Sequence, residues 1–375
     1  MVSGWIQLDP LLSRFNDFRV GEGVFVRYRA LATGLLTAGL AVLCGSVLAA
    51  NSPTYRVTAR YAIGGQDTGY DYLRLDPATR RLFVAHGTRV EVIDADKGTK
   101  VGEISDTPGV HGIALAPQFG HGFTSNGLAR SVTMFDLQSL KTLAVIKYTG
   151  VKPDSIEYDP ETRLVFVVNG GDTGDVSVID PARGAIVGTV SLQGGKLEQI
   201  QLDGHGHGFV NDEDENVVHV FDTHKLVQLA TWSVAPGEGP TGLAFDAQHR
   251  RLFSACGNNK LVVLDSDSGT LVTTAPIGSD PDGAAFDPRT KRVLVSNRDG
   301  TLTVIDGSGD KTYPVLQTVR TEKFARTIAL DEGSGRAYLP TAAFNPPPPP
   351  TQQNPEPKAV MVPESFVVLV VGFDR

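Results

Sequence analysis

A unit of about 43 residues recurs along most of the chain, and this repeat limits the possible folds more than any other feature. Its first marker is a short apolar run that ends at a turn. The seven copies are LRLDP at 73–77, IALAP at 113–117, IEYDP at 156–160, IQLDG at 200–204, LAFDA at 243–247, AAFDP at 284–288 and IALDE at 328–332. The spacings between their fourth residues are 40, 43, 44, 43, 41 and 44, which indicates one repeated structural unit.

The residues within each unit predict short strands. A second marker, of the form VxVID, follows each of the first six copies and ends at Asp94, Asp136, Asp180, Asp222, Asp265 and Asp306. Runs rich in Val, Ile, Leu and Phe alternate with Gly, Pro, Asp and Thr, without the apolar spacing of a helix. Four strands in such a unit match one propeller blade. We therefore predict an all-β, seven-bladed β-propeller of four-stranded antiparallel blades over residues 50–375.

The last repeat is one strand short at its C-terminal end. It offers IALD, RAYLP and SFVVLVVGF as strands, whereas YRVTARYAIG at 55–64 precedes the first full repeat. We expect this N-terminal strand to complete the last blade, because such pairing removes an exposed sheet edge.

Residues 1–49 have the pattern of an export signal with a long lead-in. Twenty uncharged residues, 31–50, follow Arg27 and Arg29, and Val47-Leu48-Ala49 resembles a cleavage site. The same length can just span a bilayer, so an uncleaved N-terminal anchor is the alternative. Either way we expect the propeller outside the cytoplasm, periplasmic or secreted.

The seventh repeat contains a proline-rich insertion at 345–364, with five consecutive prolines at 346–350. This composition favours polyproline II or irregular structure. The insertion is predicted to be a surface loop; a lid or partner-docking arm is the alternative.

Several blades resemble the YVTN-type repeat of the YncE-like β-propellers. The resemblance rests on VFVVNGGDTGDVSVID and VLVSNRDGTLTVID, and on LFVAHG and FTSNG at the equivalent strand. It covers about residues 55–375 and implies the propeller fold. Members of this family are mostly exported and lack an established enzymatic role; one relative is associated with single-stranded DNA. Fold alone does not define function.

Positions that differ between blades on one face are candidates for recognition. One residue per blade lies just before each innermost strand, and these residues should encircle the channel mouth: Asp71, His111, Asp154, Glu198, Thr241, Asp282 and Arg326. A second set ends each second strand: His86, Asn126, Asn169, Asn211, Cys256, Asn297 and Thr341, with Asn211 placed less securely because its turn is shorter. The predicted ligand-binding residues are Asp71, His111, Asp154, Glu198, Asp282, Arg326, His86, Asn126, Asn169 and Asn297.

The four carboxylates of the first set suggest two interpretations. One is a wet channel mouth in which they bond loop amides or pair with Arg326. The other is a small-ligand or cation site, for which Asp154, Glu198, Asp282 and Asn169 are the candidate metal ligands, since hard cations such as Ca²⁺ require several oxygen atoms. In composition this set resembles gluconolactonase-like propellers. That resemblance implies a metal that polarises a lactone or ester carbonyl, with His111 as the base.

Taken together, the sequence predicts an exported, monomeric, non-catalytic propeller that binds a protein, glycan or small polar ligand at the channel face. A metal-dependent lactonase or esterase at the same mouth is the alternative. The formal charge of −8 argues against nucleic-acid binding, which normally requires a basic surface. No resident cofactor is expected, apart from Ca²⁺ or another divalent cation in the second interpretation.

Overall fold

The computed structural model describes residues 54–67, 69–147, 152–171, 174–352 and 354–373. The candidate export or anchor segment at 1–49 lies outside these residues. Among the residues described, no helix combines the length and apolar character needed to cross a membrane.

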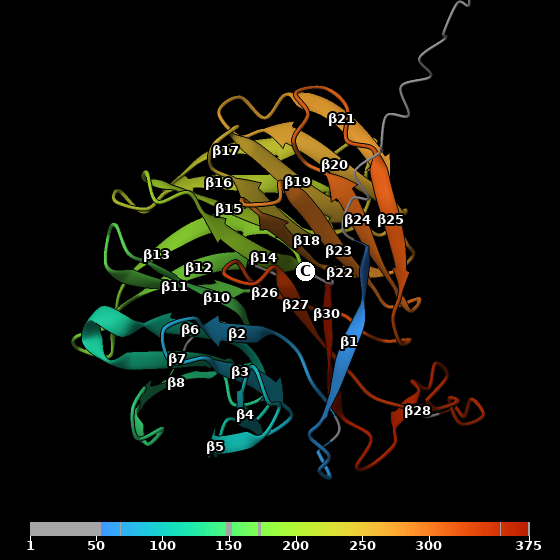
Figure 1. Cartoon of the computed structure of the whole chain (residues 1–375). Helices are drawn as coiled ribbons and strands as arrows, with labels where there is room; N and C mark the ends of the chain where they lie inside the picture. The colour runs from blue at the N-terminus through green and yellow to red at the C-terminus, as the bar shows by residue number, and fades with distance from the viewer. Residues whose placement is uncertain (1–53, 68, 148–151, 172–173, 353, 374–375) are drawn as a thin grey trace, which may run out of the picture. The chain divides into compact units, whose positions relative to one another are not determined.

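Seven four-stranded antiparallel sheets surround a central axis and follow one another in chain order (Figure 1). The strands of blades 1 to 3 are β2 (Leu73–Asp76), β3 (Arg81–His86), β4 (Arg89–Asp94), β5 (Lys100–Ile104); β6 (Val110–Ala116), β7 (His121–Asn126), β8 (Ser131–Asp136), β9 (Thr142–Lys147); β10 (Pro153–Asp159), β11 (Leu164–Asn169), β12 (Gly174–Asp180) and β13 (Ala185–Gly194). Those of blades 4 to 6 are β14 (Leu197–Leu202), β15 (His207–Asp212), β16 (Val217–Asp222), β17 (Val227–Ser233); β18 (Pro240–Asp246), β19 (Arg251–Cys256), β20 (Lys260–Asp265), β21 (Leu271–Pro276); β22 (Pro281–Asp287), β23 (Arg292–Asn297), β24 (Thr301–Asp306) and β25 (Val315–Arg320). A short 3₁₀ helix, η1 (Pro117–Phe119), lies between β6 and β7. The predicted seven-bladed, all-β architecture is confirmed.

The seventh blade is built from both ends of the described propeller. Its strands, from the axis outward, are β26 (Ala329–Asp331), β27 (Arg336–Thr341), β30 (Val367–Phe373) and β1 (Tyr55–Ala62). The antiparallel register of β1 on β30 runs from Tyr55 opposite Phe373 to Ala62 opposite Val367. The outer strand of this blade therefore comes from the N-terminal side of the first repeat.

The hydrophobic core lies between neighbouring sheets. The third residue of each second strand is large and fully buried: Phe83, Phe123, Phe166, Phe209, Phe253, Leu294 and Tyr338. Several of these pack on an aromatic ring of the next blade, as Phe166 does on Phe221 with ring centroids 5.7 Å apart. Because each sheet buries both faces, its middle strands read as continuous apolar runs rather than as strict alternation.

The recurring aspartates of the two sequence markers stabilise turns. Asp94 Oδ1 accepts hydrogen bonds from the backbone N–H groups of Asp96 and Lys97, both at 2.9 Å. Asp222 does the same for His224 and Lys225, and Asp331 for Gly333 and Ser334. These are Asx turns, in which a side chain replaces a backbone acceptor. The repeated aspartates thus belong to the blade structure, not to a site.

The proline-rich insertion leaves the molecule between β27 and β30. Its base is a two-stranded ladder of β28 (Phe344–Asn345) and β29 (Val360–Met361), and Phe344 packs on Phe324 at 4.5 Å between ring centroids. Residues 346–350 are exposed and form neither helix nor strand.

Removal of residues 54–62 should lower the free energy of unfolding by more than about 4 kcal/mol, since it uncovers the whole ladder edge of β30. Deletion of 346–357 is the matched control, and it should leave the unfolding midpoint nearly unchanged because those residues are mostly exposed. Urea denaturation followed by circular dichroism measures both. Equal midpoints for the two deletions would show that β1 contributes little to the seventh blade.

Candidate functional site

Seven side chains, one from each blade, converge on the channel mouth, and we call them the channel ring: Asp71, His111, Asp154, Glu198, Thr241, Asp282 and Arg326. Five are the second residue of β6, β10, β14, β18 or β22, whereas Asp71 lies two residues before β2 and Arg326 three residues before β26. Ion pairs connect the members from blade 6 through blades 7, 1 and 2 to blade 3. The structure therefore brings these predicted positions together; their ligand-binding role stays a prediction.

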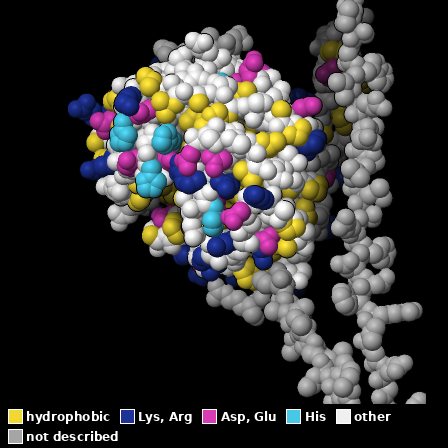
Figure 2. Space-filling view, turned by 90° about the horizontal axis from the view of Figure 1, so that it is seen from above, with side chains coloured by type: hydrophobic (Ala, Val, Ile, Leu, Met, Phe, Trp, Pro, Cys, Tyr) yellow, Lys and Arg dark blue, Asp and Glu magenta, His cyan; other side chains and the backbone are white. Residues whose placement is uncertain are grey.

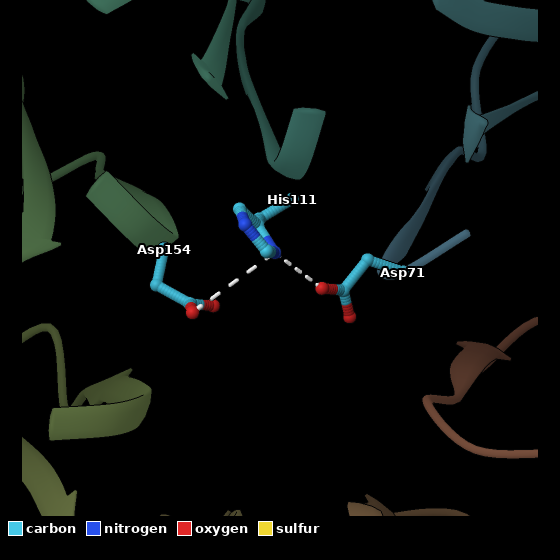
Figure 3. Close-up of side chains that lie close together, drawn as sticks. All are labelled: Asp71, His111 and Asp154. Carbon is cyan, nitrogen blue, oxygen red and sulfur yellow. Dashed lines mark hydrogen bonds and ion pairs between the residues drawn. The ribbon is translucent and has the colours of Figure 1, made fainter. Parts of the chain in front are cut away.

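His111 lies between two carboxylates of the channel ring. Its Nδ1 is 2.5 Å from Asp71 Oδ2 and 4.0 Å from Asp154 Oδ2, and all three side chains point toward one another (Figure 3). Burial acts to lower the pKa of His111, but the hydrogen bond to Asp71 and the charge of Asp154 outweigh it and raise the pKa. The imidazole is therefore held toward its protonated form.

A pair of arginines neutralises the opposite side of the ring. Arg326 lies 3.1 Å from Asp71 Oδ1 through Nη2 and 2.7 Å from Asp282 Oδ2 through Nε. Arg298, which follows β23, donates from Nη2 to the same Asp282 oxygen at 2.9 Å. Burial opposes ionisation of Asp282, but the two guanidinium groups lower its pKa below the ordinary value. Arg298 was not predicted from the sequence.

The negative charges of Asp154 and Glu198 are less well balanced by nearby positive charges than that of Asp282. Each side chain is only 14% exposed. Burial raises the pKa of Asp154, with Asp71 adding to the effect, and burial together with the charge of Asp154 raises the pKa of Glu198 well above its ordinary value. Lys196 lies 3.1 Å from Glu198 but also pairs with Glu213. The blade 3 and 4 side of the ring is therefore the place where added positive charge is most favourable.

Tyr72 lies beneath the ring and was also missed by the sequence analysis. Burial raises its pKa well above 10, and Asp154, Glu198 and Asp71 add to this effect, so its hydroxyl lies within the field of the ring carboxylates. Blades 2, 5 and 6 carry glycine at this position, and a Cβ on Gly242 would lie only 2.7 Å from the backbone of Gly283. The sequence could have indicated Tyr72, because it places a bulky residue at a repeat position where three other blades have glycine.

A cavity of about 280 Å³ borders the less compensated side of the ring. It is lined by Asp154, Glu198, Lys152, Lys196 and neighbouring residues, including glycines at 170, 171 and 195. This volume admits a small molecule next to the two carboxylates.

The second predicted set is not at an exposed mouth, which corrects the expectation for His86, Asn126, Asn169 and Asn297. All four are at most 2% exposed. The Nδ2 groups of the three asparagines donate to the third strand of the same blade, as Asn126 does to Thr133 Oγ1 at 2.9 Å. His86 stacks on Phe366 at 4.3 Å between ring centroids. These side chains stabilise blades and are inaccessible to a ligand.

The register also corrects one alignment. Asp212, rather than Asn211, pairs with Leu197 in the way that Asn169 pairs with Pro153. Asp212 Oδ2 accepts a bond from the backbone of Gly195 at 2.8 Å and lies 3.1 Å from His219 Nε2. Cys256 is also buried, and burial raises its pKa to about 12, which makes the thiol unreactive.

The groups best placed to hold a metal differ from the predicted set. Within the described residues, ligand atoms of Asp71, His111 and Asp154 lie within 4.8 Å of one another. Of the predicted ligands, Asp282 is held by two arginines and Asn169 bonds Asp175 within its blade. Two carboxylates and an imidazole suit a transition ion better than Ca²⁺, which prefers oxygen ligands alone.

The pH dependence of stability should depend on Asp154 and Glu198. Their raised folded-state pKa values destabilise the protein as pH rises above the ordinary values of 3.8 and 4.5, and His111 loses its stabilising charge as pH rises through its raised pKa above 6.5. An Asp154→Asn/Glu198→Gln variant should be more stable than the wild type at pH 8, by about 1–4 kcal/mol, and should differ less at pH 4.5.

Urea unfolding at several pH values measures this difference. Glu322→Gln, which alters an exposed ion pair with Arg60, is the control and should follow the wild-type profile. A double variant that is less stable than the wild type at pH 8 would mean that both carboxylates are fully compensated.

No protein-family model matches the chain, and no curated protein matches it. Solved structures share its fold. A chain titled Kuenenia stuttgartiensis hydrazine synthase is 16% identical, with a TM-score of 0.65 over 73% of this chain and 93% of that one. The WD40 repeats of RRP9 are 10% identical, with a TM-score of 0.71 over 85% and 100%, and U3-55K is 11% identical, with a TM-score of 0.68 over 85% and 99%. At these identities the similarity establishes the β-propeller fold of this chain and nothing about its chemistry.

Proposed function

We propose that the protein is a non-catalytic binding propeller that takes a small ligand with a cationic group at the channel mouth, against Asp154 and Glu198. The main support is that these two half-buried carboxylates both have raised pKa values and border a cavity of about 280 Å³. A bound cation would favour the charged form of both, so binding energy would come from relieving their repulsion.

The remaining ring residues support binding rather than catalysis. His111 is engaged by Asp71, and Asp71 is engaged by Arg326. The hydroxyl of Thr241, the channel-ring residue of blade 5, donates a hydrogen bond to the backbone carbonyl of Pro281 at 2.8 Å. A nucleophile must lie next to a base that accepts its proton, and among the described residues no serine, threonine or cysteine side chain is hydrogen-bonded to His111.

The proposed setting is outside the cytoplasm, and the proposed family is that of the YncE-like, YVTN-repeat propellers. The apolar segment at 31–50 with its basic flank supports export, and the strand motifs such as VFVVNG support the family. The structurally similar WD40 proteins agree with a binding role at the level of the fold. On the face shown in Figure 2, basic side chains are interspersed with acidic ones and form no continuous basic surface, which disfavours nucleic acid as the ligand.

Binding of amines is the direct test. Isothermal titration with glucosamine and 1,4-diaminobutane should show saturable binding at pH 7.5, whereas the neutral counterparts glucose and 1,4-butanediol should bind at least about tenfold more weakly, because they lack the charge that the carboxylates require. The affinity should fall as pH falls toward 4.5, since Asp154 and Glu198 become protonated.

The Asp154→Asn/Glu198→Gln variant should lose this preference, and Glu322→Gln should keep it. Equal binding of amines and neutral counterparts by the wild type, or amine binding that survives in the double variant, would contradict the proposed function.

A second candidate function is metal-dependent hydrolysis of lactones or esters, favoured by the grouping of Asp71, His111 and Asp154. A divalent ion held there would supply Lewis acidity and an activated water. The chain's own contribution would be to orient Asp71 through Arg326 and to hold His111 between the two acids.

Metal analysis separates the two functions. If the protein is a metal-dependent hydrolase, about one transition ion per chain should copurify with it in the absence of chelator. Turnover of δ-gluconolactone or p-nitrophenyl acetate should then fall at least about a hundredfold in the Asp154→Asn variant. Retained amine binding together with equal, background turnover in wild type and variant would reject the hydrolase.

A further inference from the structure

The innermost strands line a second cavity, of about 490 Å³, which begins at Tyr72, the residue that follows Asp71 of the channel ring. Its lining extends along the inner strands to Asp203, Gly204 and Glu332, which belong to the hairpin turns at the opposite face. We call this space the lower chamber. Its volume lies within the range of small-molecule sites, about 300–1,000 Å³.

One wall of the lower chamber is polar and comes from blades 1, 3 and 4. Arg74 pairs through Nη2 with Glu157, and its Nε donates to the carbonyl of Ile113 at 3.2 Å. Gln201 donates from Nε2 to the carbonyl of Leu243 at 2.9 Å, and Gln199 accepts from the N–H of Leu243 at 3.0 Å. Arg74 therefore has two polar atoms committed to the protein, and Glu157, Gln199 and Gln201 have one each.

The same four side chains keep other polar atoms free. Among the residues that the structure describes, no partner occupies Arg74 Nη1, Glu157 Oε1, Gln199 Nε2 or Gln201 Oε1. Arg74 and Glu157 thus present a donor next to an acceptor, and the two glutamines present the same combination. The side chains of Arg74 and Glu157 are 35% and 25% exposed, so their free atoms are accessible to water or to a ligand.

The facing wall comes from blades 5 to 7 and is apolar along its strands, with Glu332 in the turn at its far end. Its members are Ala244, Phe245, Ala284, Ala285, Phe286, Ile328 and Leu330. The two walls differ in the groups that they can contact: hydrogen-bonding groups of a ligand on one side and its hydrocarbon surface on the other.

We propose that the lower chamber is a binding site for a neutral planar ring that carries an amide or imide edge. The ring carbonyl accepts a hydrogen bond from Arg74 Nη1, and the adjacent ring N–H donates to Glu157 Oε1. The face of the ring lies on the apolar wall near Phe245 and Phe286. A neutral ligand fits because Arg74 and Glu157 already neutralise each other.

The site is independent of the proposed function, because its cavity shares no lining residue with the cavity that borders Asp154 and Glu198. The variant Asp154→Asn/Glu198→Gln should therefore bind lower-chamber ligands as the wild type does. Failure of amine binding at the mouth would leave this proposal unaffected. Failure of ligand binding in the lower chamber would likewise leave the proposed function unaffected.

The probes are uracil, 1,3-dimethyluracil and quinazoline-2,4-dione, measured by isothermal titration with ligand-detected NMR for weak binding. Uracil should bind with one-to-one stoichiometry. Dimethyluracil should bind at least about tenfold more weakly because it lacks both N–H donors. The fused benzene ring of quinazoline-2,4-dione should strengthen binding by about tenfold through contact with the apolar wall.

The key variant is Glu157→Gln, which preserves shape but replaces a charged acceptor; it should weaken uracil binding at least about tenfold. Arg60→Gln, at an exposed ion pair with Glu322, is the matched control and should not change binding. Urea midpoints establish that both variants are folded, and Gln201→Glu offers a second wall variant if Glu157→Gln is unstable. Absence of saturable binding by all three probes, equal binding of uracil and dimethyluracil, or unchanged binding in the folded wall variant would overturn the proposal and assign the lower chamber to water.

Discussion

Packing of each sheet between two neighbours is the constraint on which the rest of the structure depends. A blade with two apolar faces is stable only when both are covered, and a closed ring of blades covers them all. The large residue at the third position of each second strand, such as Phe166 or Phe253, fills the space between blades. This packing sets how closely the inner strands approach the axis, and it thereby places seven equivalent side chains around one channel mouth.

Convergence of this kind creates an electrostatic problem that the chain solves unevenly. Four carboxylates meet at the ring, where loss of hydration disfavours their charged forms. Arg326 and Arg298 both form ion pairs with Asp282 and so offset its negative charge. Arg326 also pairs with Asp71, which is in addition hydrogen-bonded to His111. Asp154 and Glu198 have less positive charge near them, and burial therefore raises their pKa values. An uncompensated pair in an otherwise satisfied ring is expected where a ligand supplies the missing charge.

The fold and the channel ring were predictable from the sequence because both follow from the repeat period. Equivalent positions in a closed array must lie at equivalent places, so the spacing alone brought Asp71 and Arg326 together across 255 residues. The residues at the ends of the second strands, which we predicted to be accessible, are buried. The reason is that the repeat period gives a residue's height along the axis but not the direction of its side chain. Asn126, Asn169 and Asn297 recur in three blades for a structural reason, their bonds to the next strand. Asn211 was misaligned because one short turn shifts the register by a residue.

Recognition in this molecule has to come from departures from the repeat, since seven identical blades would present identical groups in every direction. The departures are concentrated. Blades 3 and 4 carry Asp154 and Glu198 at the mouth, and Glu157, Gln199 and Gln201 in the lower chamber, whereas blades 5 to 7 supply arginines above and hydrocarbon below. Tyr72, from blade 1, is the bulky residue at a position where three other blades carry glycine, and it lines the lower chamber next to the channel ring. The same side of one channel thus carries polar groups with free atoms at two depths, the carboxylates Asp154 and Glu198 at the mouth and the Arg74–Glu157 pair with two glutamines below, and both proposed sites rest on this asymmetry.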